Sequence, residues 1–312
     1  MIYTITTNPS LDYYLNLDAL KVGALNRSYK ETYDAAGKGV NVSKFLDKLN
    51  IRSIALGFLG GFNKEYYIAL LSKYGNIQPQ FTKIGDNTRI NIKLKAGEET
   101  SLNATGPNIT DEEFNKFKIR MNQIYDNDYV ILSGNVQKEL ADKMCIVIKE
   151  LIENNVKVVL DTDDYITSKV CEYKPFLVKM DNNDIGTSEE DIINIGKDYI
   201  NKGVKYFLYS SAHTASYLFE EGGYYKCDIR NNLETGSNDC MIAGILWSKL
   251  KGANSLESFT YGNAVSSVVT MHDEKADFEK IEEACKTLKI ERIDFNEKNI
   301  KCFNVLTFSC RM

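Results

Sequence analysis

The sequence predicts an α/β fold in which helices cover both faces of a mostly parallel sheet. Short apolar runs typical of strands alternate along most of the chain with longer stretches whose apolar residues recur at helical spacing. This alternation is the pattern of repeated strand–helix–strand units, whose strands pair in parallel. A chain of 312 residues that is 43% hydrophobic can bury a large core without disulfides or metals.

Each element of this fold has its own signal. The first strand is predicted at 2–7, and an apolar helical stripe at 40–49 follows a glycine-rich turn. A strand at 54–59 ends at Gly60-Gly61, where glycine permits a tight turn. Further strands are predicted at 129–132, 156–160, 176–178 and 206–209, and helices at 138–154, between the strands at 156–160 and 176–178, and at 192–200, 241–250 and 255–270.

Four short segments depart from this rhythm because polar and apolar residues alternate in them, as in half-buried antiparallel strands. They are residues 12–17, 27–33, 89–95 and 100–103. They predict a small sheet that projects from the larger α/β part and could close as a lid over a ligand and exclude water. The alternative is an ordinary antiparallel extension of the main sheet, and the pattern alone does not decide between the two.

The composition excludes several functional classes. The chain has 38 basic and 43 acidic residues, whereas nucleic-acid binders usually carry a basic surplus. Two histidines, His213 and His272, are too few for a multi-histidine zinc site. Seven cysteines without CxxC spacing do not indicate a zinc ribbon or a disulfide framework, and they favour a reducing cytoplasm. We expect no signal peptide, no membrane span and no membrane partner.

A glycine-rich turn with a lysine, Gly37-Lys38-Gly39, precedes the first predicted helix. It is neither a P-loop, because Gly39 replaces the serine or threonine after the lysine, nor a dinucleotide fingerprint, because Val42 replaces the third glycine. Backbone amides at a helix start attract anions, and Lys38 adds a full positive charge. The alternative is a tight turn that only leads into the helix.

A second candidate motif, Gly236-Ser237-Asn238-Asp239, precedes the helix predicted at 241–250. Successive backbone N–H groups at a helix start can form an anion hole, and the helix dipole favours the ionised form of Asp239. An ionised carboxylate beside an anion hole can accept a proton from a hydroxyl group. The alternative is a plain helix cap by Ser, Asn or Asp.

Two acidic residues follow the strand predicted at 176–178. Asp181 and Asp184, close to Lys179, could hold Mg²⁺ through water. The alternative is a solvated loop or a helix cap. The charge-rich run at 273–292 is interpreted as a solvated helix face.

Taken together, these motifs resemble the ribokinase-like carbohydrate kinases of the phosphofructokinase B type over nearly the whole chain. Within that family the likeness is greatest to 1-phosphofructokinases and next to tagatose-6-phosphate kinases. The segments that carry it are TTNPSLD at 6–12, LNR at 25–27, GKGVNV at 37–42, GFLGGF at 57–62, DNTRINIK at 86–93, EETSLN at 98–103 and YGNAVSS at 261–267.

The resemblance implies a ribokinase-like three-layer sandwich with a mostly parallel central sheet and a small β-sheet lid. Residues 1–312 would form a single kinase domain, with lid strands from about 12–33 and 89–103 inserted in it. The implied reaction is transfer of the γ-phosphoryl group of ATP, with Mg²⁺, to a hydroxyl group of a phosphosugar. Such a reaction needs positioning and charge stabilisation more than covalent chemistry. In these kinases the lid often forms a dimer interface, so a homodimer is expected.

The resemblance also implies roles for individual residues. Asp239 would be the catalytic base, and the amides of Gly236, Ser237 and Asn238 would face the developing phosphoryl charge. Arginine suits the phosphate already on the sugar because its fork matches phosphate oxygens. The implied sugar ligands are Asp12, Gly37 and Asn41, the phosphate ligands Arg27, Lys38 and Arg89, and the lid ligand Asn103. On the ATP side they are Lys179, Asp181, Ser210 and Asn263, with Asp184 holding Mg²⁺ through water.

Departures from the family pattern are concentrated on the ATP side. The sugar side differs only where Ala36 replaces a glycine and Asn135 a serine. The leading expectation is conversion of fructose 1-phosphate to fructose 1,6-bisphosphate, with a tagatose-6-phosphate kinase as the first alternative. Drift on the ATP side motivates the second alternative, a non-catalytic phosphosugar-binding protein with a degenerate ATP site. The drifted positions are 181, 184, 212, 215 and 238.

Overall fold

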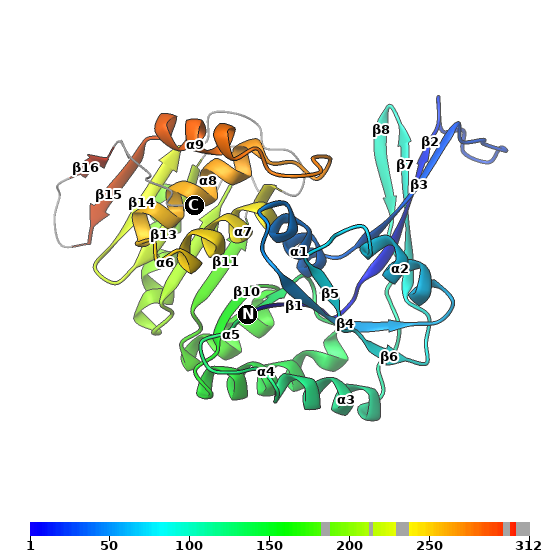
Figure 1. The fold of residues 1–312 in the computed structure, drawn as a ribbon, viewed down its shortest axis with the longest axis horizontal. Coiled ribbons are helices and arrows are strands. Elements are labelled where there is room, and N and C mark those ends of the chain that lie inside the picture. The colour runs from blue at the N-terminus through cyan, green and yellow to red at the C-terminus, as the bar shows by residue number, and fades with distance from the viewer. Residues whose placement is uncertain (182–187, 212–214, 229–236, 296–299, 304–312) are drawn as a thin grey trace.

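The computed structural model describes residues 1–181, 188–211, 215–228, 237–295 and 300–303, and its strands form a large and a small sheet (Figure 1). The strands of the large sheet are β1 (Ile2–Thr6), β4 (Ser53–Gly60), β5 (Ile77–Pro79), β6 (Thr82–Ile84), β9 (Tyr129–Ser133), β10 (Lys157–Asp161), β11 (Leu177–Asp181), β12 (Tyr206–Ser210), β13 (Ala215–Glu220), β14 (Gly223–Asp228), β15 (Ile290–Asp294) and β16 (Ile300–Phe303). Those of the small sheet are β2 (Ser10–Asn16), β3 (Lys30–Ala36), β7 (Arg89–Ala96) and β8 (Glu98–Leu102).

The helices alternate with these strands, as the sequence predicts. They are α1 (Lys38–Lys48), α2 (Asn63–Leu71), α3 (Asp111–Met121), α4 (Lys138–Glu153), α5 (Asp164–Val170), α6 (Glu189–Asn201), α7 (Ser237–Leu250), α8 (Ser255–Val268) and α9 (Phe278–Thr287).

The large sheet has the order β16-β15-β14-β13-β12-β11-β10-β9-β1-β4-β5, with β6 beside β4. All pairs from β12 to β5 are parallel, which confirms the predicted mostly parallel sheet. The antiparallel strands β13–β16 extend it beyond β12 and were not predicted. The run at 273–292, interpreted as a helix face, contains α9 and also the start of β15, whose charged residues hid the strand.

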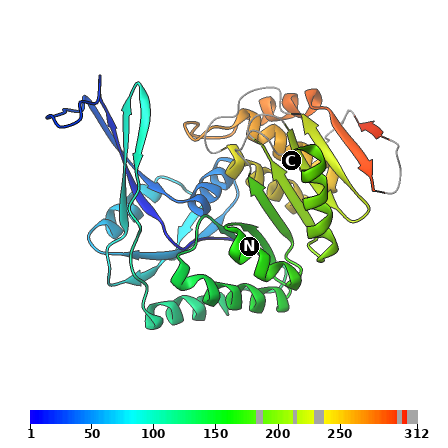
Figure 2. The ribbon, with the colours of Figure 1, turned by 180° about the vertical axis from the view of Figure 1, so that it is seen from behind.

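Helices cover both faces of the large sheet (Figures 1 and 2). Alternate strand residues enter different cores: Val130 and Leu132 pack with α3–α6, whereas Ile131 packs with α1 and α7–α9. This sidedness follows from the two-residue period of a strand. Within the described residues, no helix has the length and apolar character needed to cross a membrane. The cytoplasmic location stays a prediction.

The small sheet, which we call the lid, is separate from the large sheet and projects to one side of it (Figure 1). Its order is β3-β2-β7-β8, so the edge-extension alternative is wrong. Residues 7–9 are all that separates β1 from β2, so a central strand of the large sheet continues directly into the lid. The strand predicted at 27–33 instead begins at Lys30, because the Asn26 side chain bonds the backbone of Lys21 and Ala24 and holds a turn there.

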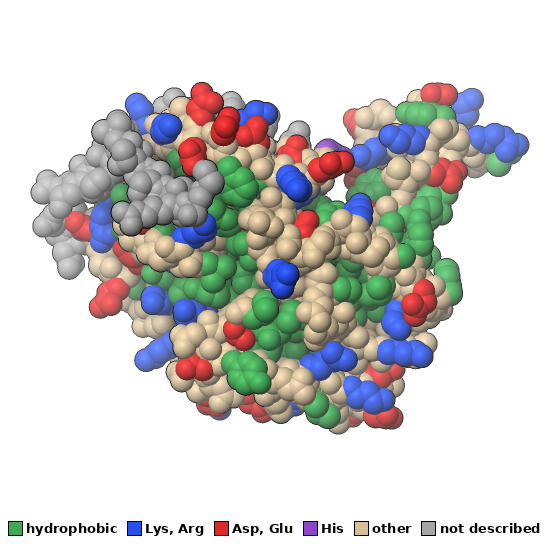
Figure 3. Space-filling model, viewed as in Figure 1, with side chains coloured by type: hydrophobic (Ala, Val, Ile, Leu, Met, Phe, Trp, Pro, Cys, Tyr) green, Lys and Arg blue, Asp and Glu red, His purple; other side chains and the backbone are tan. Residues whose placement is uncertain are grey.

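The two faces of the lid differ in chemistry. Pairing places Asp12 of β2 opposite Asp34 of β3 and Asn91 of β7, so these polar side chains share one face, which we call the inner face. Alternate residues form the outer face, where the Tyr13 and Tyr33 rings stack with centroids 4.4 Å apart. Hydrophobic side chains on the visible side of the lid can be followed in Figure 3.

Candidate active site

The candidate site lies at the carboxyl edge of the large sheet. Between β1 and β9 the strand order reverses, since β4 lies on one side of β1 while β9–β12 follow on the other. In open α/β sheets ligands bind in the crevice at such a switch point. The neighbouring strands β9, β10 and β11 end here in Ser133, Asp161 and Asp181, and each of these side chains is polar.

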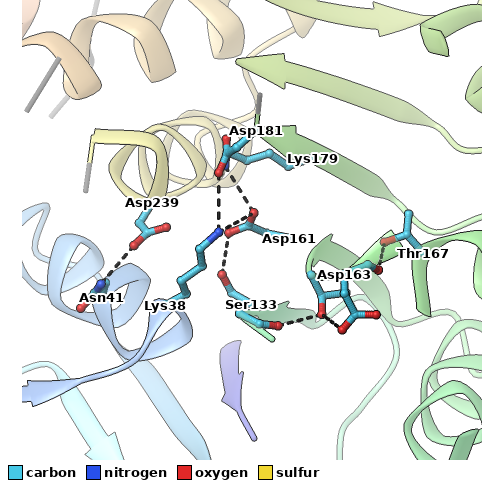
Figure 4. A network of polar contacts seen from close by, with 11 residues as sticks. Lys38, Asn41, Ser133, Asp161, Asp163, Thr167, Lys179, Asp181 and Asp239 are labelled. Atoms are coloured by element: carbon cyan, nitrogen blue, oxygen red, sulfur yellow. Dashed lines mark hydrogen bonds and ion pairs between the residues drawn. The ribbon is translucent and has the colours of Figure 1, made fainter. Parts of the chain in front are cut away.

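These three residues, together with Lys179 of β11, form what we call the strand-end cluster: Ser133, Asp161, Lys179 and Asp181 (Figure 4). The fully buried Lys179 ammonium lies 3.3 Å from Asp161 Oδ1 and also bonds Asp181. Ser133 Oγ donates a 2.7 Å hydrogen bond to Asp161 Oδ2. Burial acts to lower the pKa of Lys179, but Asp161, Asp181 and Asp239 outweigh it and raise that pKa. Lys179 is therefore a permanent cation inside an acidic cluster.

Lys38, at the first turn of α1, reaches this cluster. Its ammonium lies 3.7 Å from Asp161 and 3.6 Å from Asp181, and the side chain is 47% exposed. The sequence placed Lys38 on the sugar phosphate, whereas here its ammonium faces the predicted ATP side. Gly37 has a φ of 142°, and a Cβ on Gly39 would lie 2.7 Å from the Ile5 carbonyl oxygen. These two glycines let α1 start directly against β1.

Asp239 lies in the first turn of α7 and is buried at 5% exposure. Asn41 Nδ2 donates a 3.1 Å hydrogen bond to Asp239 Oδ2. Burial raises the pKa of Asp239 and the charge of Asp161 raises it further, while Lys179, Asn41 and Lys38 lower it, giving a pKa of about 7. Figure 4 shows Lys38 extending between Asp239 and the strand-end cluster. Asp239 can therefore take up or release a proton near neutral pH.

An open pocket of about 140 Å³ adjoins the cluster. Lys38, Asp161, Lys179 and Asp181 line it, together with residues around the start of α5. The two lysines offset Asp161 and Asp181, and Asp164 adds a further carboxylate, so the pocket suits an anionic ligand that brings its own cation.

On the lid side, Asp12 is the centre of a small buried network. Ser10 Oγ and Asn91 Nδ2 donate to Asp12 Oδ1 at 2.7 Å and 2.9 Å. Asn91 Oδ1 accepts from the Ala104 backbone N–H at 3.2 Å, which ties the loop after β8 to the network. Asn91 was not predicted as a site residue. Its signal was its position two residues after Arg89 on a strand, which puts both side chains on one face.

The predicted phosphate ligands of the lid differ in their surroundings. The half-buried Arg89 donates three hydrogen bonds to backbone carbonyls, two to Asn8 O at 3.0 and 3.2 Å and one to Ala104 O at 3.1 Å. Burial lowers its pKa. The charge of Asp12 acts against this lowering, but within the described residues no carboxylate forms a hydrogen bond or ion pair with Arg89, so its guanidinium can still bind an anion. Arg27 is exposed in the loop before β3, and Asn103 accepts from Lys93 at 3.3 Å.

The other predicted nucleotide residues are only partly informative. Ser210 is buried at the end of β12, in register with Asp181. Asn263 on α8 accepts from Ser216 and donates to Phe259 O at 2.8 Å, which ties α8 to β13. Asp184 and Gly236 lie outside the described residues, as do the side chains of Ser237 and Asn238.

The arrangement can support transfer of a charged group to a hydroxyl. A proton acceptor, Asp239, lies beside two lysines on one side, and its partner Asn41 is on the helix that leads back to the lid. The lid adds a carboxylate that can accept hydrogen bonds, Asp12, and a guanidinium without a carboxylate hydrogen-bond partner among the described residues, Arg89. A proton acceptor and cations that stabilise charge are groups that phosphoryl transfer uses.

Comparisons with known proteins point to carbohydrate kinases. A family model described as pfkB family carbohydrate kinase matches residues 6–279. The chain is 33% identical to a 1-phosphofructokinase of Bacillus subtilis over 304 residues, or 94% of this chain and 100% of that protein. It is 25% identical to a D-tagatose-1-phosphate kinase of Bacillus licheniformis, over 93% and 99% of the two chains. A solved Staphylococcus aureus protein, a candidate phosphofructokinase, superposes with a TM-score of 0.82 at 30% identity over 94% and 99% of the two chains.

Proposed function

The chain belongs to the pfkB family of carbohydrate kinases, and we propose that it phosphorylates fructose 1-phosphate with ATP as donor, giving fructose 1,6-bisphosphate. The observation that carries the proposal is the buried Asp239 between the strand-end cluster and the helix that leads to the lid. The name of the Bacillus subtilis relative supports the choice of sugar.

Asp239 is suited to remove the proton of the acceptor hydroxyl. A pKa of about 7 makes its ionised form a stronger base than an ordinary carboxylate. Asn41 holds Oδ2, while Oδ1 accepts no hydrogen bond from another described residue and can receive the hydroxyl. The proton moves to this carboxylate as the acceptor oxygen attacks, and the Lys38 ammonium lies close enough to stabilise charge on the transferred group.

The lid residues suit the phosphosugar. Asp12 is fixed by Ser10 and Asn91 and can accept hydrogen bonds from sugar hydroxyls. The Arg89 guanidinium is held by two backbone carbonyls and can offer charge-assisted hydrogen bonds to the phosphate already on the sugar. Arg27 and Asn103 remain predictions for the same phosphate.

The strand-end cluster suits the phosphates of ATP with Mg²⁺. Within the described residues, no three acidic, histidine or cysteine side chains form a metal cage. That fits Mg²⁺, which usually binds through one or two carboxylates together with substrate phosphates. Asp161 and Asp181 would hold the ion, which when bound offsets negative charge on the phosphates. Lys38, whose side chain is 47% exposed, would bind phosphate oxygens, and the fully buried Lys179 would hold the two carboxylates in place.

The proposal is tested by ADP release from the purified protein with fructose 1-phosphate, ATP and Mg²⁺. We expect saturable turnover and formation of fructose 1,6-bisphosphate. No turnover on fructose 1-phosphate, with turnover on another phosphosugar, would reject the substrate and keep the reaction class. If a phosphosugar raises the melting temperature while ATP–Mg²⁺ does not, the chain binds the sugar without catalysis.

A tagatose phosphate is the second candidate substrate, because a relative over nearly the whole chain is named D-tagatose-1-phosphate kinase. The sequence suggested tagatose 6-phosphate instead. Selectivity is a ratio of kcat/KM values, so the three phosphosugars should be compared with the same protein preparation. We expect the highest kcat/KM for fructose 1-phosphate.

We further propose that the outer face of the lid pairs two copies of the chain. Leu102 there is 54% exposed and Tyr33 40%, and Leu94 is half-buried. Exposed apolar side chains on one sheet face favour association. Sedimentation should show a dimer that Leu94→Glu dissociates, whereas Ile119→Glu, at an exposed site on α3, should not. A monomeric wild-type protein would contradict this proposal.

A further inference from the structure

A partly buried ion pair joins α1 to the lid. Lys44 lies on α1, and its side chain is 1% exposed. Its ammonium donates to both carboxylate oxygens of Asp34, at 2.9 Å and 2.7 Å. Asp34 belongs to lid strand β3, so this pair fixes the inner face of the lid to a helix of the larger part.

The pair also acts on the carboxylate that faces the sugar. Asp34 lies directly opposite Asp12 in the β2–β3 pairing. Like charges at directly opposite positions on one sheet face destabilise the sheet. The Lys44 ammonium places a positive charge against Asp34, which offsets the repulsion between the two opposed carboxylates, and Asp12 accepts from Ser10 and Asn91. Burial lowers the pKa of Lys44, and the charges of Asp34 and Asp12 act against that lowering.

The same helix carries the partner of the catalytic base. Asn41, which bonds Asp239, is three residues before Lys44, and residues at that spacing lie on one face of a helix. Helix α1 therefore makes two separate polar contacts, one from Asn41 to Asp239 and one from Lys44 to Asp34, whose partner in the strand pairing is Asp12. The close approach of Gly39 to β1 makes α1 a rigid support for this path.

Stability alone does not explain such a pair. Replacing a buried ion pair by well-packed apolar residues is often neutral or stabilising, because the desolvation cost can exceed the attraction. The pair instead fixes the position of the lid relative to α1, because two short hydrogen bonds to one carboxylate allow few orientations. On the outer face the lid is held differently, by the Tyr33 ring against Tyr66 of α2 at 5.4 Å.

We propose that Lys44 and Asp34 are positioning residues that fix the lid carboxylate Asp12 relative to the catalytic Asp239. Neither residue is expected to touch the substrate. The inference rests on the proposed phosphosugar kinase function for its kinetic test, but the geometry of the pair is independent of the choice of sugar.

The kinetic test compares Lys44→Met, Asp34→Asn and Lys44→Arg with the wild type, using fructose 1-phosphate and ATP–Mg²⁺. Misplacement of a binding group by about 1 Å can cost roughly 100-fold, so we expect the KM for fructose 1-phosphate to rise about 10- to 100-fold in Lys44→Met and Asp34→Asn. The KM for ATP should stay unchanged, and Lys44→Arg should recover most of the loss. Lys118→Met is the matched control, because Lys118 forms a 2.7 Å ion pair with Glu150 between α3 and α4.

Hydrogen exchange supplies a readout that does not depend on activity. Amides of β2 and β3 should exchange faster in Lys44→Met than in Lys118→Met. If Lys44→Met does not fold, Asp34→Asn carries the test, because Asp34 is 27% exposed and asparagine keeps an oxygen for Lys44. Unchanged KM for the sugar together with unchanged lid exchange would overturn the inference. A wild-type protein without activity on any phosphosugar would reject the proposed function, and the exchange measurement would still decide the role of the pair.

Discussion

The two sides of the candidate site treat their cations in opposite ways. On the lid, Arg89 is hydrogen-bonded only to backbone carbonyls among the described residues, and Asp12 acts on its charge without a direct ion pair. At the strand-end cluster, Lys38 and Lys179 share Asp161 and Asp181. Under the proposed function, the lid would bind a phosphate that carries no metal ion. At the cluster both lysines already have acidic partners, so that side would bind a ligand that arrives with its own cation, as ATP does in such kinases.

The lid side and the strand-end cluster meet at Asp239, so we expect the largest loss of activity when this carboxylate is replaced. Asp239→Asn should lower kcat by roughly 10²- to 10⁴-fold, the usual contribution of a positioned general base. ADP release at saturating substrates measures this. Asp277→Asn is the control, since it makes the same change at the start of α9, where Asp277 caps the helix and asparagine caps equally well. Turnover that Asp239→Asn leaves intact would remove the proposed base.

Next in size is the loss of a cation from the balanced side. Lys179→Met leaves Asp161 and Asp181 without their buried partner and should lower the free energy of unfolding by about 3–5 kcal/mol. Urea unfolding measures it, and adding Asp161→Asn should restore part of the loss. Lys202→Met, at a lysine 47% exposed and paired with Asp198, should change stability by less than about 0.5 kcal/mol. Equal stability of Lys179→Met and wild type would show that the cluster is not charge-balanced as described.

On the unpaired side the loss should appear in binding instead. Arg89→Lys keeps the charge but cannot bond two carbonyls and a phosphate together. Hydrogen bonds to charged groups contribute about 1.5–3 kcal/mol, so the KM for fructose 1-phosphate should rise roughly 10- to 100-fold. The KM for ATP should not change, and Arg120→Lys on α3 serves as the control. A larger rise in the KM for ATP than in the KM for fructose 1-phosphate would reverse the assignment of the two sides.

Much of the fold could be predicted because its signals are local. Apolar periodicity located α1, α4, β9 and β12 within a few residues, and the motif resemblance to the kinase family is confirmed by the family match. The strands β13–β16 were missed because their residues are mixed in character and their partners are distant in sequence. Their burial depends on tertiary context rather than on pattern.

The site was predictable by residue type more than by neighbourhood. The sequence named Asp12, Lys38, Arg89 and Asp239, but it could not show that Lys38 turns toward Asp161 and Asp181. That contact joins segments more than a hundred residues apart, and no spacing rule reports it. Lys44 and Asp34 carry no motif at all, and only the strand register makes their relation to Asp12 visible.

The smallest predicted effect concerns pH. Because Asp239 must be ionised to act, kcat/KM should fall as the pH drops below about 7.

The same carboxyl group should make stability depend on pH. Asp239 binds its proton more tightly in the folded state than in the unfolded chain, where its pKa is near 3.8. The protonated Asp239 therefore contributes fully to the free energy of unfolding below about pH 3.8, and this contribution is lost as the pH rises through about 7. Melting temperatures should show Asp239→Asn gaining on the wild type across that range. A constant difference would mean that Asp239 titrates as an ordinary carboxylate.

The position of β1 has a consequence for how the chain is made. It is synthesised before its partners, because it pairs with β4 and with β9, and it continues into β2, whose neighbour β7 begins at Arg89. β1 cannot have both of its neighbours in the large sheet until β9, which ends at Ser133, has been synthesised. At roughly 5–20 residues per second the first strand waits on the order of ten seconds for its second neighbour. During that time an apolar strand is unpaired on one edge, so expression should depend on chaperones and temperature more than the stability of the finished fold suggests.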